Sequence, residues 1–313
     1  MTARTLEGPH MKHRRLLLIA ALLVALGPPA YWALVLRSPA PGPAFALDLA
    51  RVRALADSLP GARPSAVRYE EILALRFAEA MVMAGDPWKE TPMPVYAYQL
   101  VFPDRTIVVD TALAKADGKP EFLGLRYDTA AYERMNAAMA KASQILVTHE
   151  HMDHIGGIAA HPQLARLKPA LRLTAEQIAN PKGMEPVKLH ANAMMGYEPL
   201  RYDDLLAIAP GVVLIKAPGH TPGSQMVYVR RADGRELLLL GDVSWRLRNI
   251  DALRERPLFM TLMIGENREA VMAQFVALHA LRGSEPALAL VPGHDGVAVE
   301  ALAAAGTLQK GFQ

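Results

Sequence analysis

The stretch "THEHMDHIGG" (148–157) gathers three histidines, a glutamate and an aspartate within residues 149–154. It follows the apolar run "QILV" (144–147), which is typical of a buried strand. In an extended chain residues i and i+2 share a face, so His149 and His151 point the same way. Gly156 and Gly157 predict a tight turn that brings His154 to the same point. Imidazole is the commonest metal ligand, so this pattern favours a metal site at a strand end over a polar surface loop.

Composition limits which metals and partners are plausible. The chain has 313 residues, of which 51% are hydrophobic and 21% charged, enough for one large domain or two small ones. The formal net charge of +3 gives no reason to expect nucleic acid. The absence of cysteine excludes disulfides and thiolate ligands, so a metal would be held by imidazole and carboxylate, which suits zinc, iron or manganese.

The N-terminal segment, residues 1–37, is predicted to be a membrane anchor or signal segment. Residues 16–36 carry no charge for 21 positions, close to the ~20 that span a bilayer. Basic residues at 12, 14 and 15 precede this run, so the N-terminus is expected in the cytoplasm. The chain would then cross the inner membrane once, with the domain on the periplasmic side. Gly27, Pro28 and Pro29 interrupt the run, and a cleaved signal that releases a secreted protein is the alternative. A buried core helix is a third interpretation. Met1 and Met11 are both candidate first residues.

Residues 38–92 are predicted to form a linker and an N-terminal extension. "RSPAPGPAFA" (37–46) has linker composition, and residues 47–61 have helical periodicity that ends at Pro60 and Gly61. Residues 65–90 fit either a strand or a helix.

From residue 93 to 313 the pattern predicts a single domain, in which apolar strands repeatedly end in Asp or His. Helical stretches, at 128–142, about 155–168 and 267–283, separate these strands. Strand ends that meet at one sheet edge would present their polar residues to a shared cleft. A single His after "PG" is more often a turn residue, but five such ends in one chain favour a site. The residues are Asp110, His149, His220, Asp242 and His294.

These motifs resemble the metallo-β-lactamase-fold hydrolase superfamily, and in particular its glyoxalase II and lactonase-like branch. The family pattern H-x-H-x-D-H is present at 149–154, followed by "PGHTPGS", "GD" and "PGHD", and "TIVVDTAL" matches the first family motif. The resemblance covers about residues 93–298. It implies an α/β fold, a four-layer αββα sandwich with its metal cleft along one sheet edge, here joined to an N-terminal transmembrane helix.

The resemblance also implies a ligand set for two Zn²⁺, with iron or manganese as other candidates. His149, His151 and His220 would hold the first ion; Asp153, His154 and His294 would hold the second, and Asp242 would bridge both. Asp110 would orient a histidine ligand. A metal-bound hydroxide would attack an ester, lactone or related carbonyl substrate, with Asp153 as the catalytic residue that orients it and relays its proton. Glu150 is expected to be structural, and Ser224 to belong to a turn.

Members of the superfamily catalyse many reactions, so the substrate is inferred from the positions at which this sequence differs from particular branches of the family. Quorum-quenching lactonases place a tyrosine three residues after the bridging Asp, where this chain has Trp245. The bridging carboxylate argues against β-lactam specialisation. Two alternatives to the hydrolase stay open: a mononuclear iron dioxygenase of the persulfide type, and a non-catalytic metal-binding sensor domain at the membrane.

Two further stretches are candidates for shaping a small-molecule pocket. Residues 183–199, rich in Met and Gly, could form a mobile lid, and Trp245 and Arg248 could contact an anionic or apolar substrate. For both stretches ordinary packing or a solvated face is an equally good interpretation. The sequence does not indicate an oligomeric state.

Overall fold

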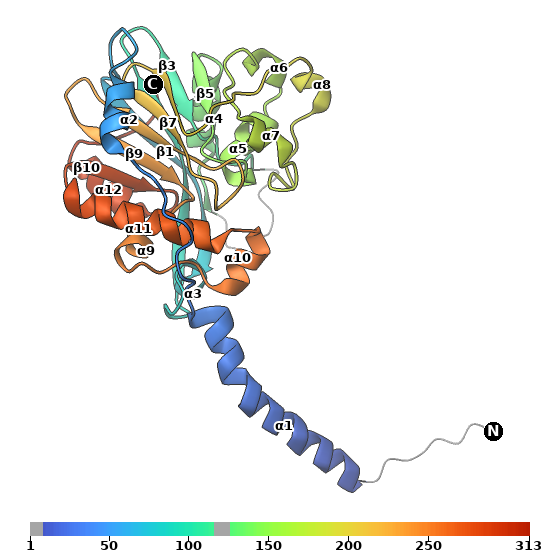
Figure 1. The fold of residues 1–313 in the computed structure, drawn as a ribbon. Coiled ribbons are helices and arrows are strands. Elements are labelled where there is room, and N and C mark those ends of the chain that lie inside the picture. The colour runs from blue at the N-terminus through green and yellow to red at the C-terminus, as the bar shows by residue number, and fades with distance from the viewer. Residues whose placement is uncertain (1–8, 116–125) are drawn as a thin grey trace.

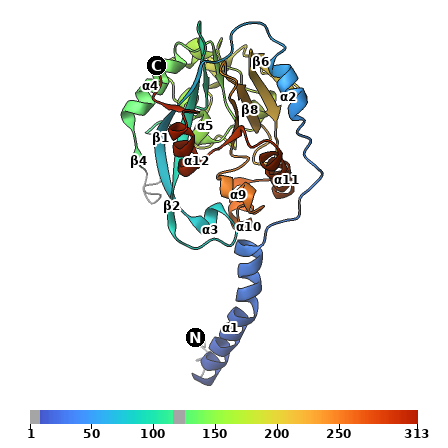
Figure 2. The ribbon, with the colours of Figure 1, turned by 90° about the vertical axis from the view of Figure 1, so that its left-hand side faces the viewer.

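Two β-sheets pack face to face and form the centre of the molecule (Figures 1 and 2). The structure, a computed structural model, describes residues 9–115 and 126–313, with side chains from residue 19 onward. Residues 1–8 of the predicted anchor segment and 116–125 of the predicted domain lie outside this description. The first sheet has the strand order β11-β1-β2-β3-β5, with β4 paired to β1, and the second has the order β10-β9-β8-β7-β6.

The strands of the first sheet are β1 (Ala66–Ala78), β2 (Glu90–Val101), β3 (Thr106–Val109), β4 (Arg126–Tyr127), β5 (Gln144–Leu146) and β11 (Gln309–Lys310). Those of the second are β6 (Leu205–Ala209), β7 (Val212–Lys216), β8 (Gln225–Arg230), β9 (Glu236–Gly241) and β10 (Leu288–Pro292).

Both faces of each sheet are buried, which explains why the strands are apolar throughout. In β2, Tyr96 and Tyr98 face the core between the sheets, whereas Val95 and Ala97 face the helices outside. In β7 the residues divide in the same alternating way between the inner and outer cores. This alternation produces four layers, helix, sheet, sheet and helix, as the sequence led us to expect.

Helices α4 (Thr129–Met139) and α5 (Met152–Ala159) cover the first sheet, and α2 (Leu49–Ala56) and α11 (Arg268–Ser284) cover the second. The other helices of the domain are α3 (Glu79–Val82), α6 (Leu164–Leu167), α7 (Ala175–Ala179), α8 (Ala191–Met194), α9 (Leu247–Asp251), α10 (Leu258–Ile264) and α12 (Gly296–Ala304).

Strand β1 resolves the stretch that the sequence left ambiguous. It pairs with β2 from Ala66 to Ala78, with one irregularity between Glu71 and Leu73, and both of its faces are largely buried, so no clear polar alternation marks it. The first sheet therefore includes residues on both sides of the boundary predicted at residue 93. The preceding segment also lies against the domain, since the Gly42 amide donates to the Glu269 carbonyl at 2.9 Å.

The N-terminal helix α1 (Pro9–Tyr31) projects from one end of the sandwich (Figure 1). Pro28 and Pro29 do not end it, but a π-helical turn, η1 (Trp32–Leu36), follows three residues later. Among the described residues, Ile19–Leu36 is the one helical stretch long and apolar enough to cross a bilayer, with a mean hydropathy of 2.0 and only 6% of it buried.

Candidate metal centre

The carboxyl ends of five strands meet at one edge of the sandwich. Strand β3 runs parallel to β5, β9 runs parallel to β10, and β7 and β9 are both antiparallel to β8. The residues that follow these strands therefore reach a common point, and the structure brings together all five predicted strand-end residues: Asp110, His149, His220, Asp242 and His294.

The prediction of a tight turn at Gly156 and Gly157 is wrong. The chain enters helix α5 at Met152, with His151 as the residue before its first turn, so His154 reaches the site from the first turn of a helix. Both glycines lie inside this helix, where they allow close packing. A Cβ on Gly157 would stand 2.2 Å from the Thr111 carbonyl oxygen. Glycine is thus required for helix-to-strand contact, which places His154 next to Asp110.

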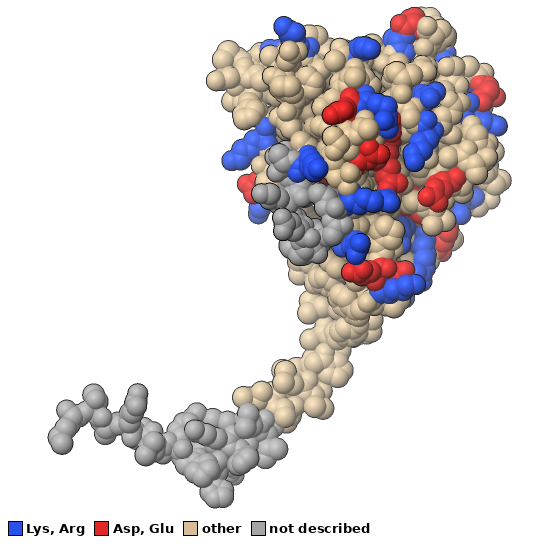
Figure 3. All heavy atoms as spheres, turned by 180° about the vertical axis from the view of Figure 1, so that it is seen from behind, with Lys and Arg blue, Asp and Glu red and all other residues tan. Residues whose placement is uncertain are grey.

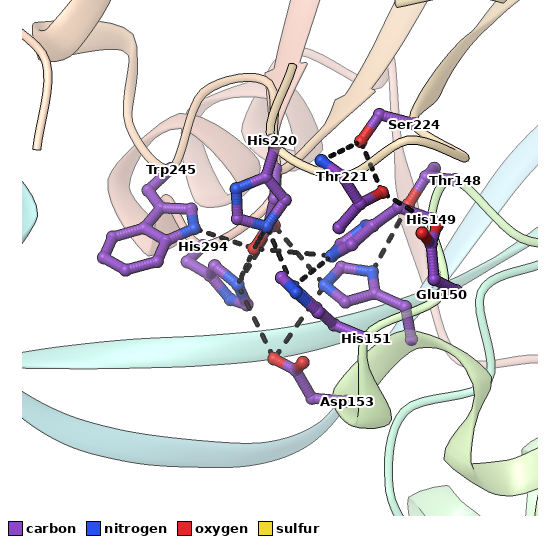
Figure 4. A network of polar contacts seen from close by, with 12 residues as sticks. Thr148, His149, Glu150, His151, Asp153, His220, Thr221, Ser224, Trp245 and His294 are labelled. Atoms are coloured by element: carbon purple, nitrogen blue, oxygen red, sulfur yellow. Dashed lines mark hydrogen bonds and ion pairs between the residues drawn. The ribbon is translucent and has the colours of Figure 1, made fainter. Parts of the chain in front are cut away.

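A first group of donor atoms comprises His149, His151, His220 and Asp242, and its members lie within 4.8 Å of one another. The His151 Nδ1 atom lies 3.1 Å from His149 Nε2 and 2.9 Å from His220 Nε2. Figure 4 shows these rings turned toward one centre. A second group comprises Asp153, His154 and His294 and meets the same distance limit. In it, Asp153 Oδ2 lies 3.8 Å from His154 Nε2 and 3.7 Å from His294 Nε2.

Asp242 lies between the two groups, and its carboxylate contacts both. Its Oδ2 atom is 3.4 Å from His220 Nε2 of the first group and 3.2 Å from His294 Nε2 of the second. Its Oδ1 atom is 3.4 Å from His154 Nε2 and 3.1 Å from His294 Nε2, on the second group's side. A carboxylate in this position can contact two cations at once.

Buried acceptors hold the remaining ring nitrogens of three histidines. Nδ1 of His154 lies 2.9 Å from Asp110 Oδ2, Nδ1 of His220 lies 2.7 Å from Glu266 Oε2, and Nδ1 of His294 lies 2.8 Å from the Pro94 carbonyl oxygen. Such partners fix the tautomer and leave Nε2 free to point at the shared centre. Asp110 was predicted to orient a histidine, and its contact with His154 has the geometry for that role.

Asp110 is held in an unusual backbone conformation. Its φ of 60° is left-handed, which costs a residue with a side chain on the order of 1–3 kcal/mol. Its carboxylate accepts from the Thr148 amide at 2.7 Å and from the Thr148 hydroxyl at 2.8 Å. These contacts join the end of β3 to the start of the histidine loop and stabilise the strained residue.

Glu150 and Ser224 have structural roles, as expected. The buried Glu150 carboxylate accepts from Asn180 Nδ2 at 2.7 Å and from the Thr221 hydroxyl at 2.8 Å, so it joins the histidine loop to the loop that carries His220. Ser224 Oγ accepts from the Thr221 amide at 3.0 Å, which is a turn contact. Figure 4 shows both beside the site rather than inside it.

A buried charged cluster lies behind His220, and no sequence motif indicates it. Arg256 and Glu266 are fully buried and form an ion pair, and Arg256 Nη2 also lies 3.3 Å from the Asp242 carbonyl oxygen. Glu255, also buried, pairs with Arg268 at 2.8 Å. Isolated charged residues between two helices carry no motif, so only the three-dimensional structure reveals this support.

Burial and charge shift the pKa values of the site in opposite directions. Burial lowers the pKa of His149 well below its usual value and that of His151 to about 3. For His154, burial is outweighed by Asp110, Asp242 and Asp153, which together raise its pKa. The pKa of Asp242 is held well below its usual range because neighbouring His294, His154 and His149 outweigh the effect of burial. The carboxylate is therefore ionised, as a cation ligand must be.

A pocket of about 570 Å³ opens over the two groups. Trp245, as predicted, lines it, and its indole Nε1 donates to Asp242 Oδ2 at 2.7 Å. The prediction for Arg248 is wrong: its side chain is mostly exposed, is not among the pocket residues, and pairs with Asp86 at 2.7 Å. Gly183 and Glu185 contribute to the wall, so part of the segment 183–199 borders the pocket, while its role as a lid stays a prediction.

The donor set fits metal ions. Among the described residues, His154 Nε2 and Asp242 Oδ1 are buried without a hydrogen-bond partner, and both atoms point into the cluster. Buried polar atoms normally have partners, because leaving one unsatisfied costs about 1–3 kcal/mol. Imidazole nitrogens and carboxylate oxygens converging on one place are the ligands that zinc and related divalent ions bind.

Comparisons with known proteins agree with this geometry. The family model described as the metallo-beta-lactamase superfamily matches residues 91–295. A probable metallo-hydrolase of Mycobacterium tuberculosis is 29% identical over 197 residues, which cover 56% of this chain and only 62% of that protein. An N-acyl homoserine lactonase of a Bacillus species is 25% identical over 182 residues, or 53% of this chain and 70% of that protein.

Solved structures share the fold. An N-acyl homoserine lactone hydrolase with N-hexanoyl-L-homoserine bound at its catalytic metal centre superposes with a TM-score of 0.59 at 17% identity, covering 76% of this chain and 96% of that one. AidC, described as a dizinc quorum-quenching lactonase, gives 0.51 at 14% identity, covering 75% and 92%.

The molecule is thus a two-sheet sandwich with a cluster of histidine and aspartate side chains at one edge, of the residue types that hold metal ions. The family match covers well over half of the sequence, and the chain belongs to the metallo-β-lactamase superfamily. The resemblance drawn from the sequence motifs is thereby confirmed.

Proposed function

We propose that this protein is a dinuclear zinc hydrolase acting on an ester, lactone or related carbonyl substrate. His149, His151 and His220 would hold one ion, Asp153, His154 and His294 the other, and Asp242 would bridge them. The observation that carries the proposal is the placement of the Asp242 carboxylate in contact with both donor groups. Two bound divalent ions lower the pKa of a shared water and polarise a carbonyl oxygen.

The protein's own residues would orient the reactants. Asp153 lines the pocket and its side chain is only partly buried, so its carboxylate can accept a proton from water at the pocket floor. Trp245 holds Asp242 through the indole N–H and closes one side of the pocket. The buried acceptors behind His154 and His220 keep these rings aligned during turnover.

Two observations support the carbonyl substrate class. Relatives and structural neighbours include N-acyl homoserine lactonases, whose substrate is a lactone. The pocket also has an apolar side, with Leu75, Phe77, Met93 and Met260, that suits the hydrocarbon part of an ester or lactone. The indole of Trp245 cannot serve as the phenolic acid of the lactonases, so proton donation to the leaving oxygen is assigned to Asp153.

We further propose that α1 anchors the protein in the inner membrane by a single pass, with the domain on the periplasmic side. The apolar stretch Ile19–Leu36 supports the span, and the basic residues before it support the orientation. Cleavage at the segment 44–46 and secretion is the alternative. Detection of the intact N-terminus in a membrane fraction, with domain exposure to protease added outside the inner membrane, tests it; a soluble protein lacking residues 1–46 would contradict it.

Metal analysis together with a substrate panel tests the hydrolase. We expect two zinc ions per chain and turnover of at least one member of a panel of p-nitrophenyl butyrate, γ-butyrolactone, N-hexanoyl homoserine lactone, a thioester and a phosphodiester. Asp153→Ala should abolish that turnover. One iron per chain with oxygen uptake on a persulfide would favour the dioxygenase, and a metal-loaded protein inert on the whole panel would favour the sensor domain.

A further inference from the structure

Exposed apolar side chains surround the point where the N-terminal helix joins the domain. We call Trp32, Leu34, Trp88, Leu262 and Met263 the apolar collar. Leu262 and Met263 are 69% and 66% exposed, and both belong to α10, which contacts the η1 turn. Figures 1 and 2 show α10 and α3 at the same end of the sandwich from which α1 leaves. Large apolar residues gathered in one exposed place mark an interaction surface.

Aromatic contacts join this collar to the helix. The Trp88 ring stacks on Phe259 of α10 with the centroids 6.0 Å apart, and its indole N–H donates to the Tyr31 hydroxyl at 3.0 Å. Tryptophan and tyrosine at the end of an apolar helix are typical of the boundary between lipid and water. In Figure 3 the visible face of the described helix shows no charged side chains, while charges of both signs cover the domain.

The junction is fixed rather than flexible. Val35 is buried, and the carbonyl oxygen of Leu36 accepts from Arg254 Nη2 at 3.2 Å. One residue further on, the Arg37 carbonyl oxygen accepts from Arg268 Nη2 at 3.1 Å. These contacts set the angle between helix and domain. The collar therefore has a fixed position beside the C-terminal end of α1.

Part of the collar also forms the rim of the pocket. Leu262 and Met263 line the pocket mouth, and Met260 and Ile264 of the same helix continue the apolar wall inward to Trp245, beside the metal groups. An unbroken apolar path thus leads from the exposed surface next to α1 to the donor atoms of His220 and Asp242.

We propose that the collar rests on the bilayer that holds α1, and that the pocket takes amphiphilic carbonyl substrates whose alkyl chain partitions into that bilayer. The proposed substrate class rests on the proposed hydrolase activity, whereas the proposed contact between the collar and the bilayer does not. The carbonyl group would reach the metal groups while the alkyl chain lies along α10. Each methylene group that leaves water strengthens such binding by about fourfold, so short-chain substrates should be disfavoured.

Lipid contact can be measured without any activity. The chain lacks cysteine, so Leu262→Cys and Val297→Cys each provide one thiol for a bimane label in the full-length protein. Val297 is the matched control because it is apolar and 80% exposed but lies on α12, away from the collar. In phosphatidylcholine vesicles with brominated acyl chains, we expect the label at position 262 to be quenched at least threefold more than at 297. Equal quenching at both positions would overturn the proposed contact between the collar and the bilayer.

Chain-length selectivity tests the substrate class. Trp32 and Trp88 belong to the collar but not to the residues that line the pocket, so the double variant Trp32→Ser, Trp88→Ser should keep hydrolysis of p-nitrophenyl butyrate in vesicles. Hydrolysis of p-nitrophenyl decanoate should fall at least fivefold, whereas Val297→Ser should change neither rate.

The outcomes separate the two proposals. An equal effect on both esters, or no effect on either, would overturn the amphiphilic substrate. If the wild-type protein hydrolyses neither ester, nor any member of the substrate panel, the hydrolase proposal fails, and the bimane quenching still decides whether the collar contacts lipid.

Discussion

The inner side of the pocket is lined by polar residues and the outer side by apolar residues. On the inner side, polar residues hold the candidate ligands: Asp110 contacts His154, Glu266 contacts His220, and the Trp245 indole donates to Asp242. On the outer side, α10 presents apolar residues, two of which are largely exposed. Buried polar groups require fixed partners, whereas apolar contacts tolerate shifts in shape. The inner side is thus suited to metal geometry and the outer side to substrate choice.

This contrast predicts that changes on the inner side reduce activity toward every substrate, whereas changes on the outer side alter selectivity. The largest effect is expected at the carboxylate between the two groups. Asp242→Asn removes a negative charge that faces both donor groups, so bound metal should fall below two ions and kcat/KM should drop on the order of 10³-fold. Metal content by mass spectrometry and steady-state kinetics measure this. Asp233→Asn, at an exposed aspartate, is the control, and full metal content in the Asp242 variant would contradict the assignment.

The buried ion pair behind His220 should matter most for stability. Arg256→Met leaves the Glu266 carboxylate buried with less compensating charge, and we expect the free energy of unfolding to fall by about 3–5 kcal/mol. Arg248→Met is the control, because the Arg248 side chain is mostly exposed and its ion pair with Asp86 should therefore contribute less than the fully buried pair. Urea denaturation of the metal-free proteins gives both values, and similar losses in the two variants would show that the buried cluster has no special role.

Asp110→Asn isolates the charge that orients His154. Asparagine tolerates the left-handed backbone that Asp110 adopts, so the fold should be kept. Zinc affinity, measured by competition with a chelator, should fall about 10–100-fold, as expected when a partner of a ligand histidine is lost. Asp104→Asn, in an exposed turn, should leave it unchanged. An unaltered affinity in the Asp110 variant would mean that Thr148 alone positions the loop.

Trp245→Phe removes one hydrogen bond from Asp242 and keeps most of the ring. A hydrogen bond to a charged group contributes about 1.5–3 kcal/mol, so kcat/KM should fall at least about tenfold with metal content nearly unchanged. The same loss should occur with short and long substrates. Loss confined to long-chain esters would instead assign Trp245 to substrate packing alone.

The smallest effect is expected on the outer side. Met263→Ser shortens the apolar rim, and the preference for p-nitrophenyl decanoate over butyrate should narrow about threefold to tenfold. Ratios of kcat/KM for the two esters measure this change. An unchanged ratio would place the alkyl chain elsewhere in the pocket.

The sequence was sufficient for the candidate ligands but not for what supports them. Each candidate ligand follows a strand end or opens a helix, so local motifs locate it, and the strand directions bring the motifs together. Glu266 and Arg256 contact the site through tertiary packing alone and leave no local pattern. Gly157 was misread as a turn residue because close packing and a turn both call for glycine. Strand β1 was ambiguous because burial on both faces hides its period.

The burial of Val35 beneath the domain has a consequence for maturation of the polypeptide. A peptidase that cut within residues 44–46 would remove this side chain, together with the Gly42 amide that bonds to Glu269 and the Ser38 hydroxyl that accepts from the Glu255 amide. The shortened protein would expose an apolar surface beside α10, and this surface would favour self-association. This packing supports the proposal that the N-terminal segment is retained rather than cleaved.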